Sequence, residues 1–378
     1  MSNLVLYRKY RPQTFQEVVG QEHVKQTLLN ALKEQRVAHA YLFSGPRGCG
    51  KTTMARILAK AVNCEDKTSA EPCNKCSSCV DIMSNRAVDI IEIDAASHRG
   101  IDEVRELREG VKFGPTKGNY KVFILDEAHQ LTSGASNAFL KTLEEAPSHA
   151  IFILATTEAE KMITTIISRC QRFDFRKITV PETVERLKMI AKKEKVQLED
   201  DAFKMIAAAS GGALRDAESL LSQVFSLAGK GEKIKKDDVK NLLGLVEREV
   251  VSGFLTAVFE NKPVDGLEVI EKAMDQGVSP EAFHENLMHY LREIMILKIL
   301  VENDADDKSS SVTESLIAKL TQEEIKEMKD VAGQIGFGKL KELIDIFHAA
   351  GERIRFSPIP QLPLEVALAE AIRVLQEK

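Results

Sequence analysis

An eight-residue stretch near the start of the chain has the residue types and spacing of a phosphate-binding loop. It fits the pattern G-x-x-x-x-G-K-[ST] and consists of Gly45, Pro46, Arg47, Gly48, Cys49, Gly50, Lys51 and Thr52. Glycines let backbone N–H groups turn inward around phosphate oxygens, and the start of a following helix adds positive potential. We expect Lys51 to reach the β- and γ-phosphates of ATP, Thr52 to bind Mg²⁺ through its hydroxyl, and Thr53 to complete the nucleotide contacts. The alternative is a glycine-rich turn between a strand and a helix.

Two carboxylates that could act on the same nucleotide follow an apolar run at 121–125. Ligands of open α/β sheets bind beyond the carboxyl ends of the strands, which is where Asp126 and Glu127 would lie. We expect Asp126 to hold Mg²⁺, directly or through water, and Glu127 to be the general base that polarises the attacking water. Taken alone, such a strand end usually marks only a polar loop, but the phosphate loop upstream favours the catalytic interpretation. His129 is interpreted as structural, because the ATPase mechanism needs no imidazole.

Four cysteines fall at the spacing C-x8-C-x2-C-x2-C, and they are Cys64, Cys73, Cys76 and Cys79. Four thiolates form a closed tetrahedral zinc site with no position for water, so the predicted role of Zn²⁺ is structural. Four free thiols in a loop are the alternative. The two remaining cysteines of the chain need no metal.

A sheet must position these residues. Short apolar runs bounded by turn or charged residues predict strands at 41–43, 88–93, 121–125 and 151–154. Continuous runs of this kind are typical of parallel strands buried on both faces. With a helix at 51–62 after the phosphate loop, the pattern predicts a doubly wound α/β domain over residues 1–178, with the zinc module inserted at about 64–79.

The strand signals stop after residue 178. Thr179 and Glu182 have the spacing of a capping box, with Pro181 in the first turn of the helix that follows. A small helical domain is expected at 179–242, with helices at 182–195, 200–209 and 213–228 and a break at 229–231. The all-helical remainder, 243–378, is expected to have a polar loop at 303–311 and helices at 247–260, 264–276, 280–302, 312–330, 338–355 and 362–377.

Composition limits the function further. The chain has 378 residues, 52 basic and 57 acidic, so the net charge is 52 − 57 = −5. This excludes a protein that coats nucleic acid by bulk charge, but not one with a local basic patch. There is no apolar run of about 18 residues for a membrane span and no signal peptide at the N-terminus. Six cysteines without an export signal point to a reducing cytoplasm.

Further motifs resemble the AAA+ ATPases, and among them the clamp-loader γ/τ family of bacterial DNA polymerase III. The resemblance covers almost the whole chain, is strongest over 1–220, and rests on the segments 7–15, 18–21, 140–145, 154–157 and the Ser-Arg-Cys motif at 168–170. The family carries a zinc module after the phosphate-loop helix, as here. One departure is Cys49, where a small apolar residue is usual.

The resemblance implies roles for five residues around the nucleotide. Thr157 takes the sensor-1 position near the γ-phosphate, and Arg215 takes the sensor-2 position of the helical lid. The adenine would be bordered by Arg11, Val19 and Leu214. An isolated arginine is usually a surface salt-bridge partner, so Arg215 is assigned by its motif alone.

Arg169, in the Ser-Arg-Cys motif, resembles the arginine finger that enters the ATP site of a neighbouring subunit. A guanidinium suits this task because it is always charged and forks onto phosphate oxygens.

A local DNA-binding surface is also implied, because helix N-termini of the family track the phosphates of primed DNA. Our candidates are Arg99, Arg105 and Lys141. Contacts with the backbone carry no sequence information, which suits action at any primer end. The alternative is that the helix charges pair with nearby carboxylates, namely Glu103, Glu106 and Glu109.

The function implied is an ATPase of the DNA polymerase III holoenzyme, a clamp-loader motor subunit. It would join δ, δ′ and further γ/τ copies in a pentameric ring held by a C-terminal collar, and load the sliding clamp β onto primed DNA during replication. Because the sequence ends without a proline-rich linker, we expect either a γ-like product or a truncated τ. A longer τ form would add the replicative helicase and the polymerase as partners. The alternatives are a branch-migration helicase, a non-catalytic ring subunit, and a zinc-dependent interaction module with a vestigial ATPase fold.

Overall fold

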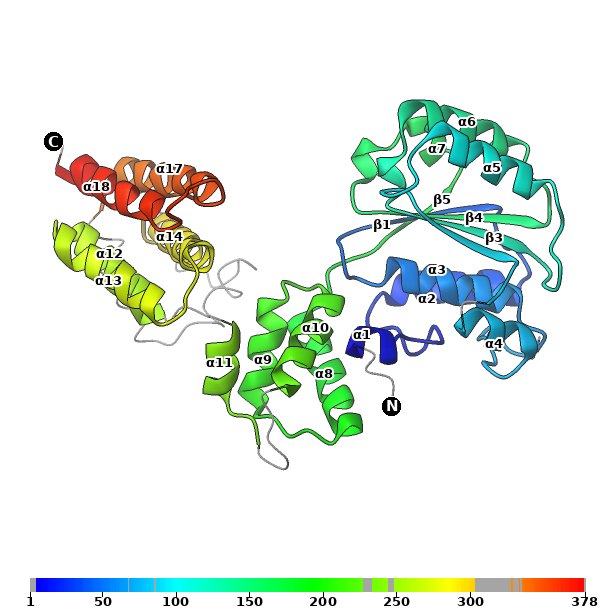
Figure 1. Cartoon of the computed structure of the whole chain (residues 1–378), viewed down its shortest axis with the longest axis horizontal. Coiled ribbons are helices and arrows are strands. Elements are labelled where there is room, and N and C mark those ends of the chain that lie inside the picture. Colours follow the sequence, from blue (N-terminus) through cyan, green and yellow to red (C-terminus); the bar gives the residue numbers. More distant parts are fainter. Residues whose placement is uncertain are drawn as a thin grey trace. The chain divides into compact units, whose positions relative to one another are not determined.

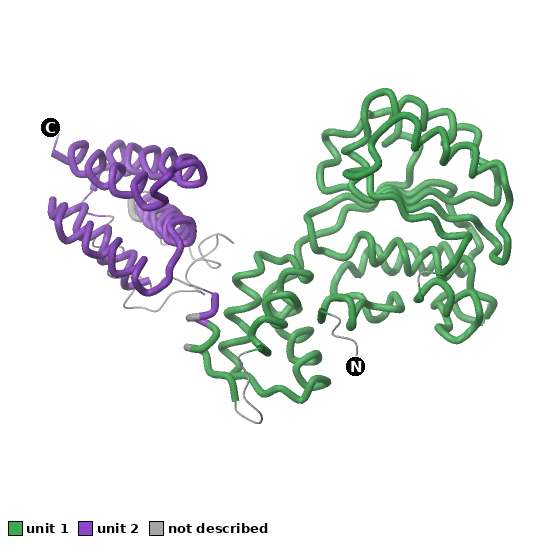
Figure 2. The backbone as a smooth tube through the Cα atoms, in the orientation of Figure 1, with its two compact units in different colours: residues 1–239 green, residues 240–378 purple. Residues whose placement is uncertain are grey.

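The computed structural model is shown in Figure 1, and the chain divides into two compact units, Met1–Val239 and Lys240–Lys378 (Figure 2). The residues that the structure describes are 5–66, 68–84, 86–226, 233–243, 248–302, 328, 333 and 335–376. The predicted break at 229–231, the predicted loop at 303–311 and, apart from residue 328, the predicted helix at 312–330 lie outside these ranges.

The first unit is built on a five-stranded sheet in which every neighbouring pair of strands is parallel. The order is β2-β3-β4-β1-β5. The strands are β1 (Ala40–Ser44), β2 (Ile90–Asp94), β3 (Lys121–Asp126), β4 (Ala150–Thr156) and β5 (Gln171–Asp174). The four predicted strands and the parallel α/β architecture are confirmed. The sequence pattern does not reveal β5, because Phe173 is the only buried residue of this edge strand.

Helices cover both faces of the sheet (Figure 1). One face carries α5 (Ile101–Val111), α6 (Ser133–Glu144) and α7 (Thr164–Ile167), and the other carries α2 (Glu22–Lys33) and α3 (Lys51–Val62). All residues of β1 and β4 are buried, and their side chains alternate between the two cores, as strands covered on both faces require. Shorter elements are α1 (Leu6–Lys9), α4 (Ser77–Met83), η1 (Ala128–Gln130) and η2 (Ala159–Lys161).

Three helices follow the sheet in the first unit: α8 (Val180–Glu194), α9 (Asp200–Ala209) and α10 (Leu214–Phe225). The predicted capping box is confirmed, because the Thr179 side chain accepts from the Glu182 amide while the Glu182 carboxylate accepts from Thr179. The short, charged helix α11 (Lys236–Leu243) has no counterpart among the predictions.

The second unit is helical, as predicted. Its described helices are α12 (Arg248–Phe259), α13 (Pro263–Asp275), α14 (Pro280–Glu302), α17 (Phe337–Ile354) and α18 (Leu362–Gln376). In its core Phe254 meets Phe283 and Phe347 edge-on, with ring centroids 5.4 and 5.7 Å apart. Across the described part of the chain, no helix combines the length and apolar character needed to cross a bilayer.

Candidate nucleotide-binding site and cysteine cluster

The loop between β1 and α3 depends on glycine for its shape. Gly48 and Gly50 have φ values of 76° and 102°, in the left-handed region that other residues rarely adopt. At Gly45 a Cβ atom would lie 2.4 Å from the carbonyl oxygen of Phe175. The predicted glycine positions are therefore required by the backbone path around the loop.

Lys51 places its positive charge inside this loop. It is the first residue of α3, so the N-terminus of the helix faces the loop. Its side chain is buried, and Nζ donates hydrogen bonds of 2.7 and 2.9 Å to the carbonyl oxygens of Gly45 and Pro46. Cys49 is also buried here, and its thiol donates to the same Pro46 oxygen at 2.9 Å, leaving the loop path undisturbed.

Two acid–hydroxyl pairs form where the start of α3 meets the carboxyl ends of β3 and β4. Thr52 Oγ1 donates a 2.8 Å hydrogen bond to Asp126 Oδ2, and Thr157 Oγ1 donates a 2.9 Å hydrogen bond to Glu127 Oε2. Glu127 sits at a left-handed φ of 48°, which turns the chain sharply after β3. A hydroxyl and a carboxylate oxygen in contact are the hard oxygen ligands that Mg²⁺ prefers, so Thr52 and Asp126 fit this ion.

His129, which we expected to be structural, lies beside Thr156 and Glu127. Its Nδ1 lies 3.0 Å from Thr156 Oγ1 and 3.5 Å from Glu127 Oε2, and its side chain is 3% exposed. On the other side of the ring, Nε2 lies 3.4 Å from Glu158. The imidazole therefore contacts the Glu127 carboxylate, which the spacing of the sequence does not reveal.

Two of the residues expected beside the adenine contact the phosphate loop or its helix. Arg11 Nε donates to Thr53 Oγ1 at 3.2 Å, and burial, followed by the nearby charge of Arg56, lowers the pKa of this arginine. The amide of Leu214, at the start of α10, donates to the Gly48 carbonyl at 3.1 Å. Val19 is half-buried in the same segment as Arg11.

The two candidate arginines differ in their surroundings. The Arg215 guanidinium lies 4.8 Å from the centre of the Tyr7 ring, one residue after the contact between α10 and the phosphate loop. Arg169 is turned towards α6 and α7, where it pairs with Glu144 at 2.5 Å and donates to the Thr165 carbonyl at 2.9 Å. The fold thus brings the segment of Arg215 to the loop, whereas Arg169 contacts Glu144 and Thr165 of α6 and α7.

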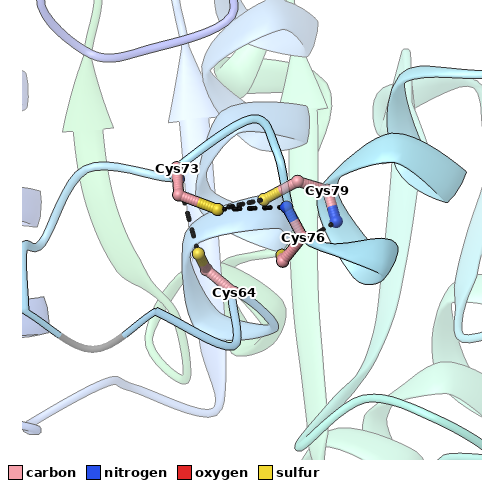
Figure 3. Close-up of side chains that lie close together, drawn as sticks. All are labelled: Cys64, Cys73, Cys76 and Cys79. Atoms are coloured by element: carbon pink, nitrogen blue, oxygen red, sulfur yellow. Dashed lines mark hydrogen bonds between the residues drawn. The ribbon is translucent and has the colours of Figure 1, made fainter.

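The four predicted zinc ligands gather after α3 (Figure 3). The sulfur atoms of Cys64, Cys73, Cys76 and Cys79 all lie within 4.8 Å of one another. Sulfurs that bind one zinc ion tetrahedrally at about 2.3 Å would be separated by about 3.8 Å, so the cluster has the size the ion needs.

Backbone N–H groups support the cluster as well. Cys73 Sγ accepts from the amides of Lys75 and Cys76 at 3.4 and 3.3 Å, and these bonds lower the pKa of Cys73 to about 6. Burial raises the pKa of Cys64 and Cys79. One thiol is therefore prepared for ligation, and a bound cation would favour the thiolate form of the others.

Three family models from one replication machine match successive parts of the chain. They are described as DNA polymerase III, delta subunit (residues 20–179), DNA polymerase III clamp loader subunit, ATPase lid domain (182–230), and DNA polymerase III subunits gamma and tau domain III (234–377). DNA polymerase III subunit tau of Bacillus subtilis is 42% identical over 98% of this chain and 63% of the relative. The chain belongs to the DNA polymerase III gamma/tau family.

Other relatives agree with this assignment. The gamma/tau subunit of Mycobacterium tuberculosis is 38% identical over 98% of this chain and 62% of that protein. The tau subunit of Escherichia coli K12 is 40% identical over 79% of this chain and 46% of that protein. The chain thus spans less than two thirds of the gamma/tau relatives that it matches.

Solved structures show weaker similarity. The Holliday junction branch migration motor RuvB of Thermotoga maritima covers 66% of this chain and 79% of its own, with a TM-score of 0.47 and 22% identity. A similarity of this size assigns no function to a gamma/tau chain.

The DNA-contact candidates of this gamma/tau chain lie around α5 and α6. Arg105 pairs with Asp102 at 2.8 Å, a carboxylate that is not among the expected partners, whereas Arg108 lies 3.8 Å from Glu109. Exposed pairs of this kind contribute little to stability. Arg99 and Lys141 are exposed.

Sequence reasoning missed a contact that links the segment of Arg11 and Val19 to the end of the sheet. Gln21, at a left-handed φ of 58°, is fully buried. Its side chain donates to the Arg176 carbonyl at 2.7 Å and accepts from the Arg176 amide at 3.1 Å. Gln21 belongs to the segment 18–21 that carries part of the family resemblance, but nothing in that pattern indicates its partner.

Proposed function

We propose that this chain is the ATP-hydrolysing motor subunit of a bacterial replicative clamp loader. The observation that carries the proposal is the pairing of Thr52 with Asp126 and of Thr157 with Glu127 beside the phosphate loop. A phosphate cradle, a set of Mg²⁺ ligands and an oriented carboxylate are the parts that nucleotide hydrolysis needs. The gamma/tau relatives support a role in replication.

Each residue of the site then has one task. Lys51 and the loop N–H groups bind the β- and γ-phosphates, and Thr52 with Asp126 holds Mg²⁺, which would neutralise developing charge. Glu127 accepts the proton of the attacking water. Thr157 fixes the orientation of that carboxylate through its hydrogen bond.

The remaining candidates bind the base or respond to the phosphates. Arg11, Val19 and Leu214 border the adenine in this proposal, and their contacts with Thr53 and Gly48 support it for the first and the last. Arg215 reports the nucleotide state to the helices that follow residue 178.

Arg169 serves the ATP site of a neighbouring subunit. Its ion pair with Glu144 keeps it on the surface of α6 and α7, from which it is available to another chain.

We assign different tasks to three domains. Residues 1–178 hydrolyse ATP, residues 179–242 form a lid, and residues 243–378 form a collar. The cysteine loop at about 64–79 is a structural zinc module inserted in the first. The second compact unit has its own apolar core, as an independent collar domain requires.

The proposed partners are δ, δ′ and further gamma/tau copies in a ring of five, together with the sliding clamp β and primed DNA, in the cytoplasm. Arg99, Arg105 and Lys141 would contact the DNA backbone, additively across subunits because the chain itself is acidic. If a longer tau form exists, the helicase and polymerase are partners of the additional part.

The test is ATP hydrolysis by the assembled loader, with and without clamp and primed DNA. We expect stimulation by DNA, and its loss in Glu127→Gln, which retains the shape of the side chain but not the base. The matched control is Glu160→Gln, an exposed carboxylate on η2. A Glu127→Gln loader that hydrolyses ATP at the wild-type rate would contradict the assignment.

A further inference from the structure

The loop that carries the cysteines is also attached to the segment 11–19. Glu71 lies in this loop, two positions before Cys73. Its Oε2 accepts a 2.8 Å hydrogen bond from the amide of Phe15, and its Oε1 accepts a 3.0 Å hydrogen bond from the amide of Gln16. One carboxylate thus holds two successive backbone N–H groups far away in the sequence, and both bonds are charge-assisted.

Segment 11–19 depends on such contacts because it contains no helix or strand. Phe15 is fully buried in the core that α3 shares with the sheet, whereas the backbone around it needs side-chain partners. Lys60 of α3 is buried and donates a 2.9 Å hydrogen bond to Gln13 Oε1, and Arg11 donates to Thr53 of the same helix. The phosphate-loop helix therefore holds the segment from one side, and Glu71 holds it from the cysteine loop.

We propose that Glu71 is a positioning residue for the nucleotide base, and that metal bound at the four cysteines sets the affinity for ATP through it. The inference rests on the proposed function, in which Arg11 and Val19 border the adenine. Glu71 itself touches neither the base nor the phosphates. It acts by fixing the backbone between those two residues.

The chain between Cys64 and Cys73 explains how a bound metal ion would affect Glu71. Cys64 comes directly after the Asn63 cap of α3, and Cys73 comes shortly after Glu71. An ion bound by both cysteines closes the loop between them, which removes conformational freedom from Glu71 relative to α3. Without the ion the carboxylate loses its fixed place, and the amides of Phe15 and Gln16 lose a preorganised partner.

The phosphate loop is held differently. Gly45 lies against Phe175 and Gly48 lies against Ala213, so closely that a Cβ atom at either position would clash. Lys51 donates hydrogen bonds to carbonyl oxygens of the loop itself. None of these contacts involves Glu71. Loss of the metal should therefore weaken recognition of the base while phosphate recognition persists.

The experiment compares two ligands, Mg²⁺-ATP and inorganic Mg²⁺-tripolyphosphate, which lacks the base. For Glu71→Ala we expect ATP binding about tenfold weaker, the size of a lost hydrogen bond to a charged group, and tripolyphosphate binding within about twofold of wild type. Glu71→Gln keeps one acceptor oxygen and the volume of the side chain, so its ATP affinity should lie between those of wild type and Glu71→Ala. The control is Glu65→Gln, because Glu65 lies in the same loop but accepts from Ser77 and Ser78.

Metal removal by a chelator gives the second arm. It should weaken ATP binding by wild type about as much as Glu71→Ala does, and add little to the loss in that variant, because both act on one element. Hydrogen exchange at the amides of Phe15 and Gln16 should accelerate in both cases, while exchange in β4 stays slow and shows that the fold is intact.

Three results would overturn the inference. Unchanged ATP affinity in Glu71→Ala would show that the carboxylate positions nothing, and equal losses for both ligands would show a general effect on folding. Full additivity of chelation and Glu71→Ala would show that the metal acts elsewhere. A wild-type chain that binds neither ligand would overturn the proposed function as well, whereas normal wild-type binding with an unaffected variant would overturn this inference alone.

Discussion

The hydroxyl of Thr157, directly after β4, donates a 2.9 Å hydrogen bond to Oε2 of Glu127, directly after β3. The two strands are neighbours in the sheet, so parallel pairing brings their carboxyl ends together. Glu127, the proposed general base, is therefore oriented by a residue that follows a neighbouring strand. In the proposed function, this contact would distinguish residues that bind the nucleotide from a residue that orients the general base, Glu127.

Replacing Thr157 by valine removes the donor and keeps the branched shape. We expect turnover to fall about tenfold or more, because misplacing a general base forfeits part of its contribution, while ATP affinity stays close to wild type. Single-turnover hydrolysis and equilibrium binding measure the two effects. Thr157→Ser retains the hydroxyl and should recover most of the rate. Equal rates for the valine and serine variants would contradict the role.

Lys51→Ala should show the opposite pattern to Glu127→Gln. The lysine places a buried positive charge inside the phosphate loop, so its removal should abolish tight ATP binding. Glu127→Gln should bind ATP normally and hydrolyse it slowly. Titration with a fluorescent ATP analogue separates them. Tight binding by Lys51→Ala would show that its charge does not serve the phosphates.

The purified chain should contain about one zinc ion, ligated by the four clustered cysteines. Cys76→Ser should lower the zinc content and loosen residues 64–86, because the closed site stabilises this region locally, while the phosphate loop stays usable. Elemental analysis and limited proteolysis measure these effects. Cys170→Ser, outside the cluster, is the control and should leave the zinc content unchanged. A metal-free protein with four titratable thiols in the loop would refute the site.

Arg169 should act in trans. Arg169→Ala should leave ATP binding by the isolated chain nearly unchanged, yet strongly reduce DNA-stimulated hydrolysis in the loader, because an arginine finger contributes a factor of about 10³–10⁵ in related chemistry. Mixing this variant with Lys51→Ala chains should restore some activity, since an intact site then meets an intact finger. No recovery in mixed rings, or loss of binding in the Arg169→Ala monomer, would show a role in cis or in structure.

Glu182 should make the junction between the sheet and α8 sensitive to acid. The hydrogen bonds from Arg176 and then from Thr179 lower the pKa of Glu182 to about 2, from an ordinary value of 4.5. A pKa lowered by folding contributes stability above the unfolded value, and the contribution is lost as pH falls through the folded one. The difference in unfolding free energy between wild type and Glu182→Gln should therefore shrink between pH 4.5 and pH 2. Chemical denaturation across this range tests it, and a constant difference would contradict it.

Local patterns were enough to predict much of this molecule. The phosphate loop, the capping box at Thr179 and the buried strands each follow from residues close together in sequence, because glycine conformation, helix capping and burial on both faces act locally. The same holds for the four cysteines, whose spacing already predicted that they meet. Edge strand β5 escaped prediction because an edge strand needs few buried residues.

Contacts between distant segments were decided only by the tertiary structure. The order of the strands brings Thr157 to Glu127, and the path of the cysteine loop brings Glu71 to the amides of Phe15 and Gln16. A glutamate in a polar loop has no periodicity or spacing that reveals its partner, because a side-chain bond to a distant backbone amide depends on how the whole domain packs. Residue types and spacing were therefore enough to predict the candidate nucleotide and metal ligands, whereas the packing of the domain determines which residues orient them.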